Sequence, residues 1–250
     1  MTYPPGAARR LVLERVDSTN AEAQRRAACG EPGPLWILAH QQTAGRGRQG
    51  RDWAQPPGNL AATLLMRPLL TAEQAAQLSF AACLAVADLL ASLAPRARVT
   101  LKWPNDPLLN GRKVAGILLE SASRQTRLDW LAIGIGVNLA AAPPLPQRPG
   151  APVATSVVGE GGHLIAPEAA LDRLAPRLEH WIARHATEGF GPLRSAWLGR
   201  AEGLGRRIVA RLPGAEHAGI YEDVDAAGQL VLREQAGVLR ISAAELYFPG

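Results

Sequence analysis

Residues 42–53 carry the groups best suited to hold a small anion. The segment contains three glycines and three arginines and shows no apolar periodicity. Glycine lets backbone N–H groups approach a ligand closely, and the arginine guanidinium is a permanently charged fork that suits carboxylates and phosphates. The segment therefore predicts a flexible loop that covers an anion. The alternative is a solvated basic turn that binds nothing.

Gly45, Gly47 and Gly50 also satisfy the spacing G-x-G-x-x-G of dinucleotide-binding loops. That motif needs a strand before it and a helix that opens at its end, so that phosphate lies at the helix N-terminus. A strand is expected at residues 35–39, but the consecutive prolines Pro56 and Pro57 exclude an early helix. The context therefore argues against a dinucleotide-binding loop.

Lysine is almost absent from the chain. Of 27 basic residues only Lys102 and Lys113 are lysine. Because arginine supplies positive charge everywhere else, these two positions indicate sites that need a compact ammonium group. Chance placement is the alternative.

Composition indicates a globular protein with a full core. Apolar residues make up 47% and charged residues 20% of the 250 residues, which is ordinary for a soluble domain. No segment approaches ~18 uninterrupted apolar residues and the N-terminus lacks a signal-peptide core, so we expect no membrane span and a cytoplasmic location. The cysteines Cys29 and Cys83 and the histidines lack metal-ligand spacing, so no metal site is assigned.

The net charge of +5 raises the question of a nucleic-acid partner. The arginines are scattered along the chain without forming a stripe, and aromatic residues make up only 5%. A moderate basic balance also suits an enzyme that handles nucleotides and acidic partners. We therefore expect no DNA binding.

The first part of the chain predicts a mixed sheet with helices. Strands are expected at residues 10–16, 35–40, 59–66, 99–103 and 128–139, and helices at residues 21–28 and 72–93. Thr71 and Gln74 form a capping box at the start of the second helix, whose apolar breadth indicates burial against a sheet. Asn110-Gly111 is the preferred type I′ turn, which predicts a hairpin between residues 107–109 and 112–120 with Lys113 just beyond the turn.

The second part of the chain predicts helices followed by short strands. Residues 141–152 are rich in proline and predict a loop. Helices are expected at residues 167–185, bent or divided at Pro176, and at residues 192–198. Strands at residues 207–212, 218–224, 229–233 and 238–241 predict a small β-barrel. The expected domains are residues 1–200, a catalytic domain, and residues 203–250, a small barrel.

Four segments carry residue types that could act together in one site. They are the basic loop, residues 102–106, the hairpin with Lys113, and a strand that ends at Asn138. In that strand Gly134 and Gly136 remove side chains from one face, as expected where a ligand or another backbone approaches. Together the segments supply anion donors, ammonium groups, a carboxylate and a carboxamide, which suits chemistry at a phosphate. No Walker loop, kinase motif or Ser/His/Asp set competes with this interpretation.

Five segments closely resemble the signature segments of biotin protein ligases, in the same order and at suitable separations. They are Ser18-Thr19-Asn20, residues 42–53, Lys102-Trp103-Pro104-Asn105-Asp106, residues 112–120 and residues 134–138. The resemblance is strong from about residue 12 to residue 156, and weaker over the β-rich tail, which is similar to the SH3-like barrel of that family. It implies an α+β fold, with a mixed sheet covered by helices.

The resemblance also implies a two-step reaction. Biotin and ATP, with Mg²⁺, would give biotinyl-5′-adenylate, and a lysine of a biotin carboxyl carrier protein would then accept the biotin. By position, the implied biotin ligands are Ser18, Thr19, Asn20, Gln42, Arg46, Gly47, Arg48, Lys113 and Gly116. The implied nucleotide contacts are Arg48, Arg51, Trp53, Lys102, Asn105 and Asn138, and the implied catalytic residues are Lys113, Arg48 and Asp106. Asn138 and Asp106 are also placed near Mg²⁺ or the incoming amine.

Several alternatives stay open at this point. Ser18 and Thr19 could be simple helix caps, Asp106 a structural turn carboxylate, and Trp53 a packing residue that pins the loop. A lipoate or octanoate ligase or transferase of the same fold is the nearest rival, and a basic nucleic-acid-binding module the more distant one. Some members of the family carry an N-terminal winged helix-turn-helix, for which the first strand, near residue 10, leaves no room. Either a monomer or a homodimer is expected.

Overall fold

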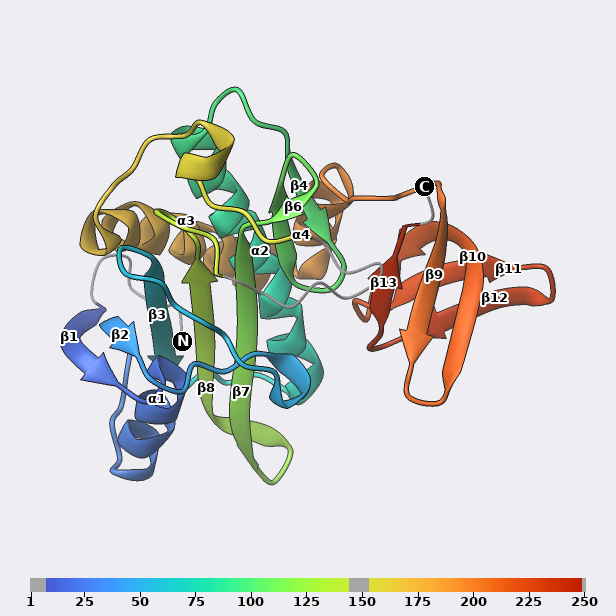
Figure 1. Ribbon diagram of the computed structural model, residues 1–250. Coiled ribbons are helices and arrows are strands. Elements are labelled where there is room, and N and C mark those ends of the chain that lie inside the picture. Colours follow the sequence, from blue (N-terminus) through green and yellow to red (C-terminus); the bar gives the residue numbers. More distant parts are fainter. Residues whose placement is uncertain (1–7, 144–152, 249–250) are drawn as a thin grey trace.

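A five-stranded sheet forms the centre of the molecule. The structure is a computed structural model that describes residues 8–143 and 153–248. The strand order is β1 (Arg9–Val16), β2 (Leu35–Gln42), β3 (Leu60–Met66), β8 (Arg127–Val137) and β7 (Ala115–Arg124). β1 and β2 are parallel, and the other neighbours in this sheet are antiparallel (Figure 1). The expected mixed sheet is confirmed.

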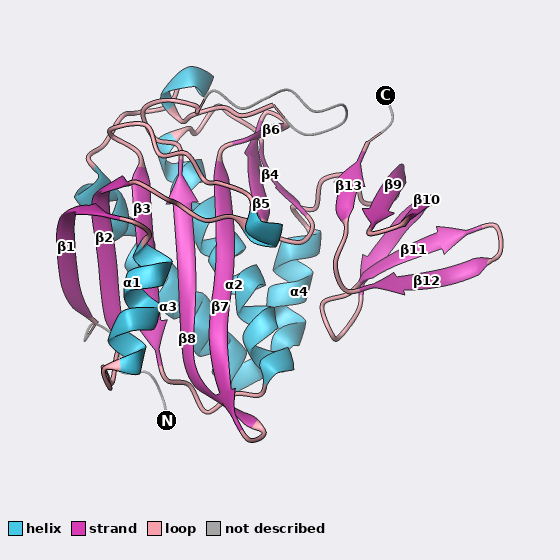
Figure 2. Ribbon diagram, turned by 60° about the horizontal axis from the view of Figure 1, so that its bottom comes forward, coloured by secondary structure: helices cyan, strands magenta, loops and turns pink. Residues whose placement is uncertain are grey.

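Helices cover the two faces of this sheet unequally. α1 (Thr19–Ala28) lies on one face, and α2 (Ala72–Leu93), α3 (Pro167–Glu188) and α4 (Phe190–Leu198) lie on the other (Figure 2). α2 begins with the expected capping box, in which Thr71 and Gln74 exchange hydrogen bonds of 3.0 and 3.3 Å. By length and composition α2 could cross a membrane, but 72% of its most apolar window is buried inside the fold. It is a core helix.

The alternation of side chains along β8 divides the core into two clusters. Ile133 and Ile135 point into the large cluster under α2, whereas Ala132 points into a smaller cluster under α1. Because side chains alternate along a strand, Gly134 and Gly136 share the face of Ala132. α1 covers only the beginning of that face. The glycine-bearing remainder is left for the candidate site.

A small second sheet carries a shorter hairpin than the sequence predicted. It consists of β4 (Val99–Lys102), β5 (Asp106–Leu109) and β6 (Arg112–Lys113). Only residues 112–113 pair with β5, and residues 115–120 of the expected second strand belong to β7, which pairs with β8 in the main sheet. The turn residues Asn110 and Gly111 have φ angles of 50° and 78°, as a type I′ turn requires. The turn therefore sets where the chain leaves β5 and where Lys113 begins its path toward β7.

The C-terminal region forms an antiparallel sheet beside the main body (Figure 1). Its order is β12 (Gly237–Ile241), β11 (Leu230–Glu234), β10 (Ala215–Val224), β9 (Arg207–Leu212) and β13 (Glu245–Tyr247). Four of these strands were expected and β13 was not. The proposed division between residues 200 and 203 stays a prediction, although the helical region ends at Leu198 and the strands begin at Arg207.

Pro176 was expected to bend or divide a helix, and the division is wrong, whereas the bend stays a prediction. α3 runs from Pro167 to Glu188 with Pro176 inside it. A proline removes a single backbone donor from a helix, and the apolar face of α3, which includes Leu171, Leu174 and Leu178, is fully buried on both sides of it. Packing therefore keeps the helix in one piece. Most of the proline-rich stretch 141–152 lies outside the described residues.

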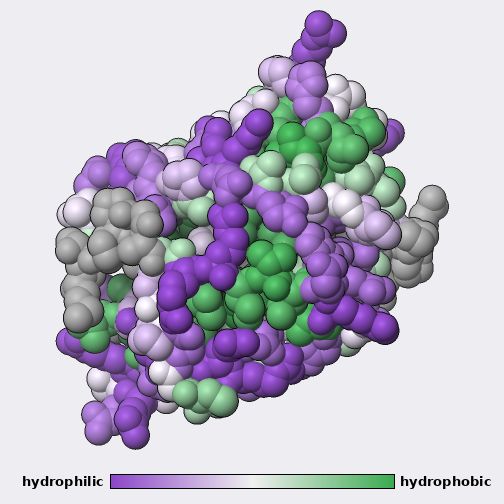
Figure 3. Space-filling model, turned by 90° about the vertical axis from the view of Figure 1, so that its left-hand side faces the viewer, coloured by the Kyte–Doolittle hydropathy of each residue, from purple (hydrophilic) through white to green (hydrophobic). Residues whose placement is uncertain are grey.

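β1 forms one edge of the main sheet, and charged side chains protect it. Arg9, Arg10, Glu14 and Arg15 are exposed along this strand, together with Val12. Figure 3 views the molecule from this side and shows an apolar area within a hydrophilic rim. Charged side chains at a sheet edge oppose pairing with a further strand.

Candidate functional site

An open cavity of about 1030 Å³ lies over the glycine-bearing face of the main sheet. The start of α1, the loop after β2, the segment before β5, Lys113, β7, β8 and β13 all contribute to its walls. It therefore gathers residues from nearly the whole length of the chain. Every residue that the sequence assigned to the site lines this cavity, so the structure brings the complete predicted set together.

One end of the cavity is built from uncharged polar side chains, and we call Ser18, Thr19, Asn20 and Gln42 the neutral end. The backbone N–H and the hydroxyl of Thr19 both donate to Gln42 Oε1, at 2.8 and 3.1 Å. Asn20 Nδ2 donates to Glu120 Oε2 at 2.8 Å. The first three residues are at most 4% exposed. Their positions are therefore fixed by hydrogen bonds within the protein.

Thr63 of β3 completes this network from the floor of the sheet. Its hydroxyl oxygen lies 2.7 Å from Asn20 Oδ1 and 2.8 Å from Thr19 Oγ1. The sequence analysis did not select Thr63. A hydroxyl within the otherwise apolar strand 60–66, which is buried throughout, was the signal that could have found it, because buried polar groups need partners.

Ser18 occupies the N-cap position of α1 but does not act as a cap through its side chain. Its backbone is extended, with φ −154° and ψ 139°, and the side chain makes no capping hydrogen bond. The residue is 2% exposed and lines the cavity. Simple capping, one of the two interpretations left open, is therefore not what its hydroxyl does.

Glycines on β7 and β8 clear the floor of the cavity. A Cβ atom at Gly134 would lie 2.2 Å from Asn20 Oδ1. Cβ atoms at Gly116 and Gly136 would lie 2.8 and 2.5 Å from the ring of Trp53. The expectation that a ligand or a backbone approaches these glycines needs a correction, because two side chains of the same protein occupy the space that the missing Cβ atoms leave.

The second end of the cavity carries positive charge, and we call Arg48, Lys102 and Lys113 the cationic end. Lys113 lies just beyond the end of β8, where Asn138 N donates to Val114 O, whereas Asn20 of the neutral end lies against Gly134. Four residues of extended strand span ~13 Å. The cavity therefore offers hydrogen-bonding groups and positive charge at two places separated by about the length of a small organic acid.

Lys113 is held through both its backbone and its ammonium group. Its N–H donates to Val153 O at 2.9 Å, and its carbonyl accepts from Thr155 N at 2.8 Å. Its Nζ lies 2.6 Å from Asp106 Oδ1 and 5.9 Å from the centre of the Trp53 ring. Asp106 thus occupies the position of an anion beside Lys113, so a purely local turn role for this carboxylate does not describe it.

Arg48 is directed into the cavity by Asn105. Arg48 Nη1 donates to Asn105 Oδ1 at 3.1 Å, and Asn105 Nδ2 donates to Ile117 O. Burial lowers the pKa of the Arg48 guanidinium, and the nearby charge of Asp106 partly offsets this. A partly buried cation whose hydrogen bond goes to a neutral amide gains a stronger, charge-assisted bond when it meets an anionic ligand.

Lys102 is the most buried cation of the site. It is 4% exposed, and its Nζ lies 6.0 and 5.7 Å from the ring centres of Tyr247 and Phe248. Burial lowers the pKa of its ammonium group, while the charges of Asp106 and Glu245 act in the opposite direction. The C-terminal sheet therefore forms one wall around a cation of the main body.

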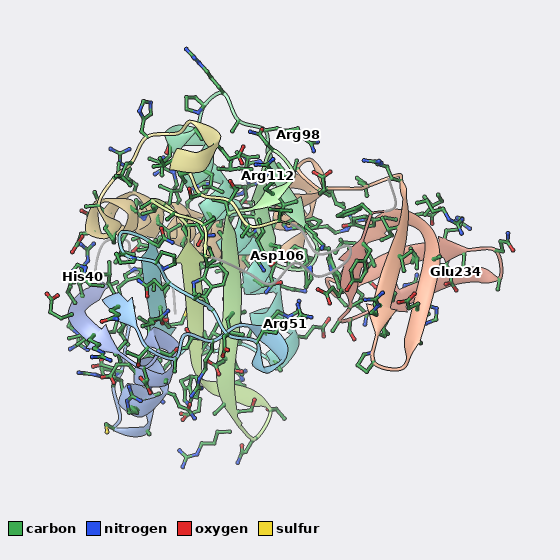
Figure 4. The ribbon with its side chains drawn as sticks, in the orientation of Figure 1. His40, Arg51, Arg98, Asp106, Arg112 and Glu234 are labelled. Atoms are coloured by element: carbon green, nitrogen blue, oxygen red, sulfur yellow. The ribbon has the colours of Figure 1, made fainter. Side chains whose placement is uncertain are left out.

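Arg51 connects the basic loop to the C-terminal sheet. Its two Nη atoms donate to the two carboxylate oxygens of Glu245 on β13, at 3.1 and 2.8 Å. The hydrogen bonds with Glu245 raise the pKa of Arg51. Burial alone would raise the pKa of Glu245, but the bonds from Arg51 outweigh it and the pKa is lowered. Arg51 and Asp106 lie on the side of the main body that faces the C-terminal sheet (Figure 4).

Arg46 and Gly47 form the outer part of the loop. Arg46 is exposed, and its Nη1 lies 3.6 Å from Glu120 Oε1, the same carboxylate that accepts from Asn20. Gly47 N donates to Arg51 O at 2.7 Å, and Trp53 N donates to Gly45 O at 2.9 Å. These bonds fold the loop back on itself, so that it covers the cavity.

Asn138 serves the framework of the site. Its Nδ2 donates to Thr155 O at 2.9 Å, and its Oδ1 lies 3.4 Å from Asn59 Nδ2. Its predicted contact with a nucleotide or with Mg²⁺ stays a prediction. Among the described residues no group of three or more His, Cys, Asp or Glu side chains could hold a metal ion.

Sequence reasoning missed two carboxylates that organise the site, Glu120 and Glu245. Glu120 joins Asn20 to Arg46, and Glu245 binds Arg51. Glu120 closes a segment that resembles the family and could have been singled out for its charge. Glu245 lies on a strand of three residues, which is too short to give a periodic signal.

The fold and the site together define an α+β protein with a cavity suited to a small molecule that combines a polar head with an acidic group. Residues 12–138 match the model of the Biotin/lipoate A/B protein ligase family. The chain belongs to this family. It is also similar to the biotin--[acetyl-CoA-carboxylase] ligase of Paracoccus denitrificans, with 52% identity over 241 residues, which is 96% of this chain and all of that protein.

Solved structures show the same fold. The biotin protein ligase from Aquifex aeolicus in complex with biotin and ATP matches with a TM-score of 0.79 at 23% identity, over 95% of this chain and 97% of that one. The biotin protein ligase from Leishmania major in complex with biotinyl-5-AMP matches with a TM-score of 0.65 at 28% identity, over 96% and 100%. The predicted α+β fold class is therefore confirmed, with a C-terminal antiparallel sheet that is consistent with an SH3-like domain, whereas its closure into a barrel stays a prediction.

Proposed function

We propose that this chain is an ATP-dependent ligase that converts biotin to biotinyl-5′-adenylate and transfers the biotin to one lysine of a biotin carboxyl carrier protein. The observation that carries the proposal is a cavity with a neutral end and a cationic end, joined by a floor of glycines. The 52% identity with a biotin--[acetyl-CoA-carboxylase] ligase over the whole of that protein supports the same reaction and the same class of acceptor.

The neutral end suits the ureido group of biotin. A cyclic urea offers one carbonyl acceptor and two N–H donors. Thr19 and Gln42 present hydroxyl, N–H and amide groups within one network, and Ser18 lines the cavity with them. The dithiolane of lipoate and the alkyl end of octanoate offer no comparable groups. A site that forms hydrogen bonds with its substrate discriminates against analogues that lack the matching groups, and these acids lack them.

The cationic end suits the first chemical step. A carboxylate oxygen of biotin attacks the α-phosphorus of ATP, the bond from that phosphorus to the bridging oxygen breaks, and pyrophosphate leaves. Two anions have to meet, and Lys113 with Arg48 would offset their repulsion as charge spreads over the phosphoryl oxygens. In this proposal the substrate anions replace Asp106 beside Lys113.

Magnesium enters the proposal as part of the substrate Mg–ATP. A magnesium ion in nucleotide sites is held through one or two carboxylates, water and the phosphates of the nucleotide. The side chains present fit that requirement, since Asp106 supplies a carboxylate and Asn138 an amide oxygen at the cavity wall. Bound there, the ion would neutralise phosphate charge.

The second step transfers biotin to the carrier. The lysine nitrogen attacks the carbonyl carbon of the adenylate, the carbon–oxygen bond to AMP breaks, and the amine releases a proton. Arg46, Gly47 and Arg51 belong to a loop that would keep water from the mixed anhydride until the carrier arrives. Trp53, Lys102 and Asn105 would contact the nucleotide portion, and Asp106 would lie near the incoming amine.

The test is exchange of radiolabelled pyrophosphate into ATP with Mg²⁺, measured separately with biotin, lipoate, octanoate and no acid. Exchange with biotin alone is the expected result. Exchange with lipoate or octanoate in place of biotin would show that the proposed substrate is wrong. The absence of exchange with every one of the acids would overturn the adenylation itself. Adding a carrier domain should then convert the adenylate to a biotinylated lysine that mass spectrometry locates.

The proposal also covers the cell location and partners. We propose a cytoplasmic enzyme whose macromolecular partner is the carrier protein, without DNA or membrane partners. Positive charge at the site is already matched by acids, as in the pairs Arg51–Glu245 and Lys113–Asp106. That pairing opposes the nucleic-acid alternative. Sedimentation distinguishes the monomer from the homodimer.

A further inference from the structure

Lys113 is positioned by a segment far from it in sequence, residues 153–155, which we call the strap. The strap runs beside β6 as a parallel partner. Lys113 N donates to Val153 O, and Thr155 N donates to Lys113 O, at 2.9 and 2.8 Å. Both backbone groups of Lys113 are therefore fixed by the strap. A shift of the strap would move the lysine.

One carboxylate, Glu160, holds both the strap and the turn that precedes Lys113. Thr155 Oγ1 donates to Glu160 Oε1 at 2.6 Å. Asn110 Nδ2 donates to Glu160 Oε2 at 2.8 Å. The side chain of Glu160 is only 9% exposed. It comes from the short helix Val158–Glu160, so that this helix, the strap and the hairpin turn meet at a single side chain.

The contacts of Glu160 favour its charged form. Burial would raise its pKa, but the hydrogen bonds from Thr155 and Asn110 and the charge of Arg112 lower it. Arg112 Nη1 lies 3.6 Å from Glu160 Oε1, and Arg112 lies at the hairpin beside Arg98 (Figure 4). Hydrogen bonds to an ionised acceptor are shorter and stronger than those to a neutral one. The link to the turn and the strap is accordingly a firm one.

We propose that Glu160 is a positioning residue for Lys113, and this inference rests on the proposed function. Glu160 does not line the cavity, so it acts through Asn110 and Thr155. Without it the two donors lose their common acceptor, and the turn and the strap can move relative to each other. A displacement of a catalytic group by about 1 Å can cost on the order of 100-fold in rate.

The first experiment compares Glu160→Ala and Glu160→Gln in the biotin-dependent exchange assay on the full chain. Glu160→Ala should lower kcat by roughly 10- to 100-fold and leave the Kd for biotin, measured by calorimetry, unchanged, because the neutral end has its own network. Glu160→Gln should restore most of the rate, since its amide can accept from Asn110 and donate to Thr155. An equal loss of biotin affinity in Glu160→Ala would overturn the proposal.

The second experiment asks whether Glu160 acts through Lys113. In a Lys113→Met background, adding Glu160→Ala should not lower the residual exchange further, since residues that act as one unit are not additive. If Glu160→Ala lowered the exchange rate in this background as much as it does in the unmodified protein, Glu160 would act on the stability of the fold and not through Lys113. Glu188→Ala is the control, because Glu188 forms an exposed pair with Arg184 on α3 and should change neither rate nor affinity.

A direct readout does not depend on activity. The chain has two lysines, so lysine-selective labelling gives one NMR signal for Lys113 and one for Lys102. Glu160→Ala should shift or broaden the Lys113 signal and leave that of Lys102 in place. Unchanged signals would overturn the positioning role even if exchange fell. Absence of biotin-dependent exchange in the unmodified protein, with the Lys113 shift present, would overturn the proposed function alone.

Discussion

The two ends of the cavity are built on different principles. At the neutral end, Thr19 and Gln42 bond to each other and Asn20 bonds to Thr63 and Glu120, so that side chains on α1 and on the main sheet fix one another. At the cationic end, Lys113 is paired with an acid of the same chain, and Arg48 comes from a loop. The neutral end is complete without a ligand, whereas the cationic end is balanced by internal substitutes for one.

This difference assigns separate tasks to the two ends. A network that is already formed loses little conformational entropy on binding and provides affinity and selectivity. At the cationic end, substrate anions replace an internal carboxylate beside the cations. These cations therefore lower the energy of the transition state most, because negative charge develops there during the reaction. Variants at the neutral end should therefore change the binding of biotin, and variants at the cationic end should change the rate.

The largest effect is expected for Lys113→Met. The variant removes the ammonium group but keeps a stem of similar length, and biotin-dependent exchange should fall by about 100- to 1000-fold, as for the loss of one positioned charge donor. Calorimetric titration should still detect biotin, because the neutral end is intact. If biotin affinity fell as much as the exchange rate, the assignment of binding to the neutral end and of rate to the cationic end would be wrong.

Gly134→Ala should displace Asn20 from the neutral end through a steric clash alone. Its Cβ would lie 2.2 Å from Asn20 Oδ1, so Asn20 must leave its place. Overpacking of this kind costs typically 1–3 kcal/mol, which corresponds to a Kd for biotin weaker by roughly 5- to 150-fold. The matched control is Gly191→Ala in α4, where nothing lies within 4 Å of the added Cβ. Equal affinities of the two variants would contradict the assigned contact.

Ser18→Ala and Thr71→Ala separate a ligand contact from a helix cap. Both residues precede a helix, but only Thr71 makes a capping bond through its side chain. Ser18→Ala should weaken biotin binding several-fold, as for one lost hydrogen bond of about 1 kcal/mol, and leave the Tm unchanged. Thr71→Ala should lower the stability by about 1 kcal/mol and leave biotin binding unchanged. The reverse pattern would make Ser18 a cap.

The elements that carry the site could be predicted because their signals are local. The capping box of α2 and the Asn110-Gly111 turn each act over a few residues and determine the backbone nearby. The turn in particular gave the correct hairpin, and with it the position of Lys113. Resemblance to a family then joined these local pieces into one set of site residues.

The connections between distant segments could not be predicted in the same way. The glycines at positions 116 and 136 indicated a cleared face, but nothing local shows that the ring of Trp53 fills it. The strap beside Lys113 and the carboxylate of Glu245 on β13 reach the site only through tertiary packing. Propensity and periodicity describe single elements and say nothing about which of them meet.

The smallest effect is expected from pH, and it distinguishes the two ends once more. Burial lowers the pKa of Lys102 from its ordinary value of 10.5, whereas the four side chains of the neutral end do not titrate. As pH rises toward 10.5, Lys102 loses its charge before an exposed lysine would, so the KM for ATP should increase while the Kd for biotin stays constant. In the same window the unfolded chain holds this proton more tightly, and stability should rise with pH. In Lys102→Met, the KM for ATP and the stability should both depend less on pH. NMR titration of the Lys102 amine in the unmodified protein gives its pKa directly. A KM for ATP that keeps the same pH dependence in Lys102→Met would remove this lysine from the cationic end.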